Sequence, residues 1–271
     1  MTKAIKLNTK TAALVVGLYL VGSIVITLIV SIFVGGAGGS GDTTNIQNYV
    51  GDSLVANLII SFILFFVAVV LFKDSRKDIF FERAAFHLSR LYWAIPLAEV
   101  GIAVVTLFTV QYSLLAFGSI ILALVAALSI GFNEEVVTRG ILLVGLRNDR
   151  VSEWKVYVIT LIVFSLLHLV NLVAGGSFIM ILIQFFGGTI YYVARRVSKT
   201  LIVPILIHAL YDFSVFLLNG PYPADVVLAE LPGFVGDITF AAFLIEMTAF
   251  VLFIIFGRKL LKNGTTGWAQ N

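Results

Sequence analysis

Cysteine is absent from this chain of 271 residues, and charged residues are scarce. Without cysteine the protein can have no disulfide scaffold, no thiolate nucleophile and no cysteine-ligated metal. Only 12% of the residues are charged, about half of the fraction usual in soluble domains, whereas 60% are hydrophobic. A soluble fold of this size could not cover its surface with so few charges. The composition therefore predicts an integral membrane protein.

Eight segments are long and apolar enough, or nearly so, to cross a bilayer, which takes about 20 mostly apolar residues. They cover residues 11–34, 54–72, 91–110, 114–132, 156–174, 178–194, 200–218 and 238–256. We therefore expect an all-α fold, a polytopic bundle of eight transmembrane helices that forms a single membrane domain over residues 1–271. The first segment is too long for the apolar region of a cleaved signal peptide, so we expect it to be retained.

The basic residues indicate an orientation, because lysine and arginine concentrate in cytoplasmic loops. Of the 18 lysines and arginines, 17 precede the first segment, follow the last one or lie in alternate loops. This pattern predicts that both termini are cytoplasmic. We interpret the basic clusters, which include Arg147, Arg195 and Arg196, as topogenic charges that contact anionic headgroups. The net charge is only +3, and no nucleic-acid partner is expected.

Several polar residues, most of them ionisable, lie inside the apolar segments, where such groups are costly and by default mark function. We assign no functional role to two of them, Glu99 and Glu246. At 1.5 Å per helical residue, Glu134 and His168 each lie about 20 Å from the nearest cytoplasmic basic residue, and His208 lies about 14 Å from it. Three segments thus bring polar groups to a similar depth, provided that the fourth helix continues unbroken beyond its glycine. The remaining members of the set are Glu135, Arg139, Asn171 and Asp212.

Helical spacing predicts different roles for these residues. Glu135 and Arg139 are four residues apart with the acid first, which favours an ion pair. Glu134 is rotated by about 100° from Glu135, so it stays free to act as a general base. His208 and Asp212 share one helical face, and His168 shares another with Asn171.

Three motifs resemble those of the CPBP family, the CAAX-protease and bacteriocin-processing (Abi) intramembrane endopeptidases. They read Glu134-Glu135-Val-Val-Thr-Arg139, Phe164-Ser-Leu-Leu-His168 and His208-Ala-Leu-Tyr-Asp212. Their order, spacing and placement agree with the family over about 80 residues, which puts the catalytic core at residues 120–215. The resemblance implies peptide-bond hydrolysis in which Glu134, assisted by His168, activates water. It also implies that His208 and the residue at 212 stabilise the oxyanion.

Residue 212 is asparagine in one branch of that family and aspartate here. An ionised carboxylate accepts hydrogen bonds but cannot donate them. Asp212 is therefore expected to orient His208 and hold it protonated. Glu135, Arg139 and Asn171 are expected to support the site.

Metal dependence stays open at this point. Glu134, His168 and His208 are a legitimate zinc ligand set. The chain has no His-Glu-x-x-His helix, however, and the same groups suffice for a glutamate-activated water, so a metal-free mechanism is slightly preferred.

The resemblance implies a multi-pass protein of a bacterial cell membrane that acts on a membrane-associated peptide or protein precursor. Two other functions compete with proteolysis. The first is a catalytically silent bacteriocin self-immunity or regulatory protein. The second is a proton-coupled transporter, because carboxylates and histidines inside helices also build proton relays. No broken-helix pair or inverted repeat supports the transporter.

Overall fold

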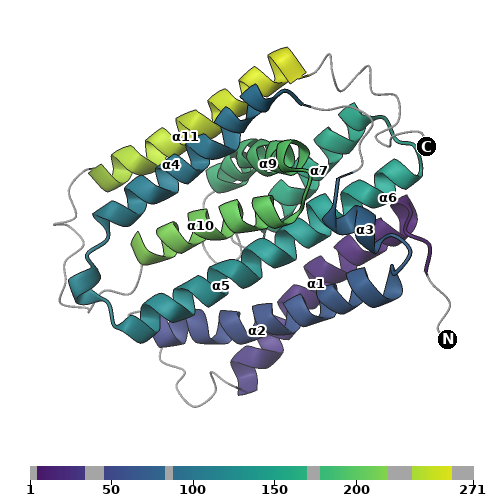
Figure 1. Ribbon diagram of the computed structural model, residues 1–271. Helices are drawn as coiled ribbons and strands as arrows, with labels where there is room; N and C mark the ends of the chain where they lie inside the picture. Colours follow the sequence, from purple (N-terminus) through teal and green to yellow (C-terminus); the bar gives the residue numbers. More distant parts are fainter. Residues whose placement is uncertain (1–4, 34–45, 83–87, 170–177, 219–233, 258–271) are drawn as a thin grey trace.

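The computed structural model describes residues 5–33, 46–82, 88–169, 178–218 and 234–257 (Figure 1). Within these ranges the regular structure is helical, apart from an isolated β-bridge between Phe81 and Thr200. The all-α class is thus confirmed. In chain order the helices are α1 (Thr9–Phe33), α2 (Ile46–Phe66), η2 (Val67–Leu71), α3 (Arg76–Phe80), η3 (Arg90–Trp93), α4 (Ala94–Thr109), η4 (Tyr112–Leu114), α5 (Phe117–Glu135), η5 (Val136–Leu142), α6 (Leu143–Asn148), α7 (Glu153–Leu167), α9 (Phe178–Ser198), α10 (Ile202–Leu218), α11 (Phe234–Leu252) and η7 (Phe253–Gly257).

Several of these helices are suited to a membrane. Among the described residues, five stretches are long and apolar enough to cross one, namely Thr9–Val30, Leu54–Leu71, Arg90–Thr109, Phe117–Asn148 and Phe240–Gly257. The helices α7 and α10 are shorter, with 15 and 17 residues. The total of eight spans and the cytoplasmic placement of both termini remain predictions.

Large apolar side chains cover the outside of the bundle. Phe62 on α2 is 73% exposed, and Phe108 on α4 is 86% exposed. In water such faces would drive association, whereas in a bilayer they meet hydrocarbon. Charged side chains lie inside instead, and Arg139, Arg147 and Arg195 are among the largest fully buried ones.

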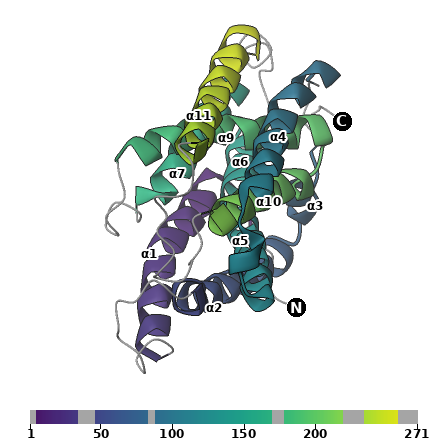
Figure 2. The same ribbon diagram turned by 90° about the vertical axis from the view of Figure 1, so that its left-hand side faces the viewer.

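Helices α5 and α10 lie in the middle of the bundle. On one side α5 packs against α2, which pairs with α1, while α10 packs against α4 and α9 on the other (Figures 1 and 2). Gly131 allows α5 and α10 to approach closely, since a Cβ atom there would lie 3.0 Å from the Ile205 carbonyl oxygen and 3.1 Å from the Ala209 amide nitrogen. This contact brings the acidic motif of α5 next to the histidine of α10.

Helix α5 continues without a break into the π-helical turn η5 and then into α6, so one span runs over Phe117–Asn148. The assumption that this helix is unbroken beyond Gly131 is confirmed. Every residue of η5 is buried, including Arg139. Such π-helical turns within α-helices occur frequently at functional sites.

A buried ion cluster joins the segment that follows α3 to α6, α7 and α9. The Glu82 carboxylate accepts hydrogen bonds from Arg147 at 2.7 Å, from Arg196 at 2.8 Å and from Arg195 at 3.2 Å. Arg147 also donates to both oxygens of Glu153. The prediction that these three arginines contact headgroups is therefore wrong. They are at most 3% exposed, because two carboxylates inside the protein offer stronger partners.

Arg195 also ties this cluster to the polypeptide backbone. Its guanidinium donates to the carbonyl oxygens of Asp78, Ile79 and Arg139. Glu82, which lies outside the membrane-spanning stretches, responds to this surplus of positive charge. Burial would raise the pKa of its carboxyl group, but the charges of the three arginines lower that pKa to about 2. Glu82 is thus an ionised counter-ion that holds together segments far apart in the sequence.

Candidate active site

The Glu135–Arg139 ion pair lies at the junction of α5 and η5. The Arg139 guanidinium donates to the Glu135 carboxylate at 2.9 Å, and both side chains are fully buried. The same guanidinium donates to Thr138 Oγ1 at 2.9 Å and to the Gly188 carbonyl of α9 at 2.8 Å. The predicted pair is therefore present, and it also ties α5 to α9.

Glu134 points to a different neighbour, His168 at the end of α7. Its Oε2 atom lies 3.7 Å from His168 Nε2, and each of these side chains is 13% exposed. Among the described residues, no lysine or arginine forms an ion pair with Glu134. The distance exceeds that of a direct hydrogen bond, so a water molecule shared by the two groups has to be considered. Two adjacent acids thus have separate environments, as their helical rotation predicts.

His168 is fixed by the backbone of its own helix. Its Nδ1 atom lies 2.9 Å from the Phe164 carbonyl oxygen, which can only accept, so Nδ1 carries the hydrogen. In the neutral ring the lone pair is then on Nε2, the atom that faces Glu134.

Helix α7 ends at Leu167, seven residues before the predicted end of this segment at 174. His168 has non-helical φ and ψ angles of −85° and 1°, and its side chain returns to the last turn. The predicted continuation of the helix through His168 is therefore wrong. Asn171 lies outside the described residues.

His208 on α10 is placed between two carboxylates. Its Nδ1 atom lies 3.2 Å from Glu135 Oε1, and its Nε2 atom lies 3.5 Å from Asp212 Oδ2. The predicted proximity of His208 and Asp212 on one helical face is thus observed. Because carboxylates face both ring nitrogens, this geometry suits a ring that carries a hydrogen on each of them. The Glu135 contact links the first motif directly to the third.

Aromatic rings surround the charged groups. Tyr191 on α9 stacks on the His208 ring with a centroid distance of 4.5 Å and an interplanar angle of 14°. Phe164 meets the rings of His168 and His208 edge-on, at 5.1 Å and 5.7 Å. The Arg139 guanidinium carbon lies 4.0 Å from the Phe164 centroid and 5.4 Å from that of Tyr191. Phe164 belongs to the second motif, but no sequence pattern indicates Tyr191.

Glu134, His168 and His208, the three residues that could ligate zinc, are not arranged around a common point as a metal site requires. In the described ranges, no group of three or more histidine and acidic side chains is placed to hold a metal ion. Both ring nitrogens of His208 face carboxylates, whereas Glu134 and His168 face each other. The donor set does not fit a three-ligand centre.

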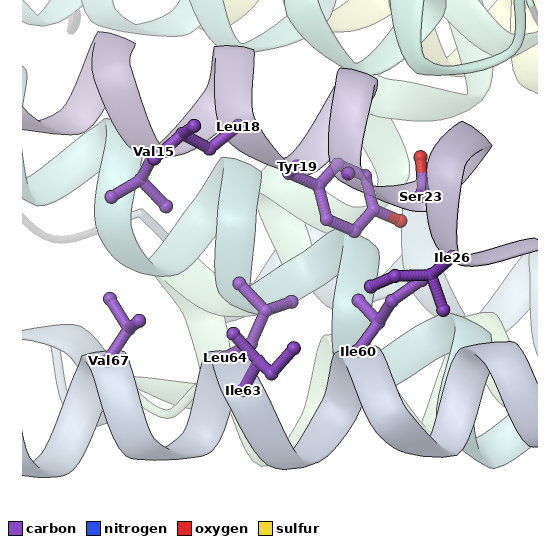
Figure 3. A pocket seen from close by; sticks show the side chains of 10 residues that line it. Val15, Leu18, Tyr19, Ser23, Ile26, Ile60, Ile63, Leu64 and Val67 are labelled. Atoms are coloured by element: carbon purple, nitrogen blue, oxygen red, sulfur yellow. The ribbon is translucent and has the colours of Figure 1, made fainter. Parts of the chain in front are cut away.

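An apolar pocket with a volume of about 180 Å³ lies between α1 and α2 (Figure 3). Its lining is aliphatic except for Tyr19 and Ser23, and residues of both helices contribute, among them Val15, Ile60 and Leu64. Tyr19 interacts electrostatically with Glu134. The pocket thus lies beside the acidic motif, on the side of α5 that is opposite to α10.

One comparison with known proteins bears on this geometry. A family model described as Type II CAAX prenyl endopeptidase Rce1-like matches residues 115–214, a range that contains all three motifs. Comparisons with curated proteins and with solved structures gave no match. The family match and the apolar exterior of the bundle both indicate a membrane protein. The chain is a multi-pass membrane protein, and its residues 115–214 match the Rce1-like model of the CPBP family.

Proposed function

We propose that this protein is an intramembrane endopeptidase that hydrolyses a peptide bond of a membrane-associated peptide or protein with a glutamate-activated water molecule. The observation that carries the proposal is the contrast between two adjacent acids. Glu135 is held by Arg139 at 2.9 Å, whereas Glu134 forms no ion pair with a lysine or arginine of the described residues and lies 3.7 Å from the Nε2 atom of His168. A carboxylate without a strong cationic partner can take a proton from water.

Glu134 and His168 are proposed to bind the attacking water between them. Glu134 accepts one proton from this water, and the oxygen adds to the carbonyl carbon of the scissile bond. His168 Nε2 can accept a hydrogen bond from the same water, because Nδ1 already donates to the Phe164 carbonyl. The tetrahedral intermediate then collapses: its C–N bond breaks while Glu134 returns the proton to the leaving amine nitrogen, and the products are an amine and a carboxylic acid.

His208 is proposed to stabilise the oxyanion of the tetrahedral intermediate. Its Nε2 atom lies 3.5 Å from Asp212, beyond the usual length of a hydrogen bond, so an N–H group there stays available to substrate. Glu135 accepts from Nδ1 on the other side and Tyr191 stacks on the ring, so both orient the histidine. Preorganised donors of this kind contribute several kcal/mol to catalysis.

The test compares the full-length wild type with Glu134→Gln in lipid vesicles, using a library of quenched peptides that includes prenylated ones. Asp74→Asn, which changes an exposed acid, is the matched control. We expect Glu134→Gln to lower cleavage by about 10² to 10⁴, the usual contribution of a general base. The control should cleave like the wild type. Unchanged cleavage by Glu134→Gln contradicts the proposal.

A strong zinc chelator supplies a second arm of the same experiment. The donor geometry supports a mechanism without metal, so cleavage should continue with the chelator present. Loss of cleavage that zinc restores would overturn this part of the proposal. A third outcome would instead favour a catalytically silent binding protein. In that case neither the wild type nor Glu134→Gln cleaves a peptide, and cells that produce Glu134→Gln keep their immunity to a bacteriocin.

A further inference from the structure

Two acidic side chains deep in the bundle have no role in the proposed hydrolysis. Glu99 on α4 is 1% exposed, and Glu246 on α11 is 3% exposed. Both lie in stretches suited to cross the membrane, and their helices pack side by side (Figures 1 and 2). Burial of an ionised carboxylate is costly unless a cation or hydrogen-bond donors compensate it.

In the described part of the chain, one oxygen of each acid lacks such compensation. The Oε2 atom of each is buried without a hydrogen-bond partner, and no basic side chain forms an ion pair with either. Glu246 is held close to α9, since a Cβ atom at Gly187 would lie 3.2 Å from its Oε2. The orphaned oxygens therefore belong to side chains that are buried in the bundle.

The titratable neighbours of the two acids are mainly acids and hydroxyl groups. Glu99 interacts electrostatically with Glu246, with Asp212 and with His208. His208 is the one basic neighbour among them, and both of its ring nitrogens already face Glu135 and Asp212. No cation of the described residues is thus left to neutralise the two carboxylates.

Two tyrosines complete the set of titratable groups around the acids. Tyr191 on α9 and Tyr211 on α10 each interact electrostatically with Glu99, Glu246 and Asp212. Because two adjacent like charges cannot both persist in a medium of low dielectric constant, one of the two carboxylates must be neutralised.

We infer that Glu99 and Glu246 form a proton-binding site, a carboxyl pair that holds one exchangeable proton at neutral pH. A proton bonds to a single carboxylate oxygen and needs no further ligand. A metal ion needs a larger ligand group, and no such group occurs among the described residues. With the proton bound, the pair contributes one negative charge instead of two beside Asp212. This site is separate from the residues proposed for hydrolysis, and its test needs no substrate.

Infrared spectroscopy of the full-length protein in lipid vesicles tests the inference. A protonated carboxylic acid gives a carbonyl band that an ionised carboxylate lacks, and that band shifts in deuterium oxide. We expect the wild type to show such a band at neutral pH, the double variant Glu99→Gln/Glu246→Gln to lose it, and the exposed Asp74→Asn control to keep it. A wild type without the band, or a double variant that retains it unchanged, overturns the inference.

Two additions keep the result interpretable. If circular dichroism shows that the double variant does not fold, the single variants Glu99→Gln and Glu246→Gln test the inference. Each of them removes the partner of the protonated group. Each should then shift the band, and two unshifted bands overturn the inference. The measurement is repeated with choline chloride in place of sodium chloride, where we expect no change. A band that appears only after sodium is removed would assign the site to a sodium ion and overturn the proton.

Discussion

Glu134 and Glu135 are consecutive residues whose chemistry is set by their partners. Glu135 accepts hydrogen bonds from Arg139 and His208 and is completely buried. Glu134 lies 3.7 Å from His168 Nε2 and keeps some exposure. A helix rotates by about 100° per residue, so neighbours in the sequence reach different sides of α5. One acid can therefore organise the site while the other stays available for proton transfer.

Removal of the Arg139 side chain should destabilise the protein strongly. Arg139→Ala leaves Glu135 as a buried charge without its guanidinium, and breaking a buried pair in this way costs about 3–5 kcal/mol. The free energy of unfolding, measured by detergent-induced unfolding in mixed micelles, should fall by that amount. The exposed Arg150→Gln is the matched control and should change it by less than about 0.5 kcal/mol. Equal effects of the two substitutions would show that the pair does not stabilise the bundle.

Sequence reasoning at this scale succeeded where a contact is local to one helix. The pairs Glu135–Arg139 and His208–Asp212 follow from a spacing of four residues. The Glu135–His208 contact and the stacking of Tyr191 on His208 were missed. These contacts join different helices, and no periodicity along the chain encodes how α5, α9 and α10 are placed relative to one another.

At the scale of helices, the contact between α5 and α10 determines whether the motifs meet. Gly131 lies one turn before Glu134, opposite the backbone of α10 at Ile205 and Ala209. Small residues allow membrane helices to approach this closely. The contact sets the distance from the acids of α5 to the histidine of α10.

Gly131→Ala should therefore impair both packing and catalysis. The added methyl group would lie 3.0 Å from a carbonyl oxygen of α10, and overpacking of this kind typically costs about 1–3 kcal/mol. We expect a lower free energy of unfolding and slower peptide cleavage. Gly118→Ala on the same helix is the control, because a methyl group added there would have nothing within 4 Å. Wild-type stability and cleavage in Gly131→Ala would show that this contact does not set the geometry of the site.

Helix boundaries could be predicted where hydropathy alone decides them. The span predicted at 91–110 matches Arg90–Thr109 closely. Inside the span predicted at 156–174, α7 ends at Leu167, where the His168 side chain returns to the Phe164 carbonyl, and residues 170–174 lie outside the described ranges. Apolar residues continue beyond that point, so composition gave no signal of the end. The span predicted at 114–132 is also longer in the structure and continues through η5 and α6 to Asn148.

For the whole molecule, the ion cluster around Glu82 holds one end of the bundle together. It connects the segment after α3 with α6, α7 and α9, which are far apart in the sequence. The composition predicted a membrane protein correctly. The orientation rule, however, treated Arg147, Arg195 and Arg196 as surface charges, because a count of basic residues does not include the buried acids that bind them.

The Glu82 cluster should make stability depend on pH in the acid range. The pKa of Glu82 is about 2 in the folded protein and 4.5 in its unperturbed state, a difference that corresponds to about 3 kcal/mol. This stabilisation is fully present above about pH 4.5 and is lost as the pH falls through 2. Glu82→Gln should lack it, so the two unfolding free energies should differ most near neutral pH and converge toward pH 2. A constant difference over that range would contradict the assigned role of Glu82.

The most direct measurement is hydrolysis of a cleavable peptide in water enriched in oxygen-18, with the full-length protein in lipid vesicles. If Glu134 activates water for direct attack, mass spectrometry will find oxygen-18 in the new carboxyl group after a single turnover. Glu134→Gln will form almost none of this product, while Asp74→Asn will form it at the wild-type rate. Labelled product at the wild-type rate from Glu134→Gln would contradict the assignment of Glu134 as the general base.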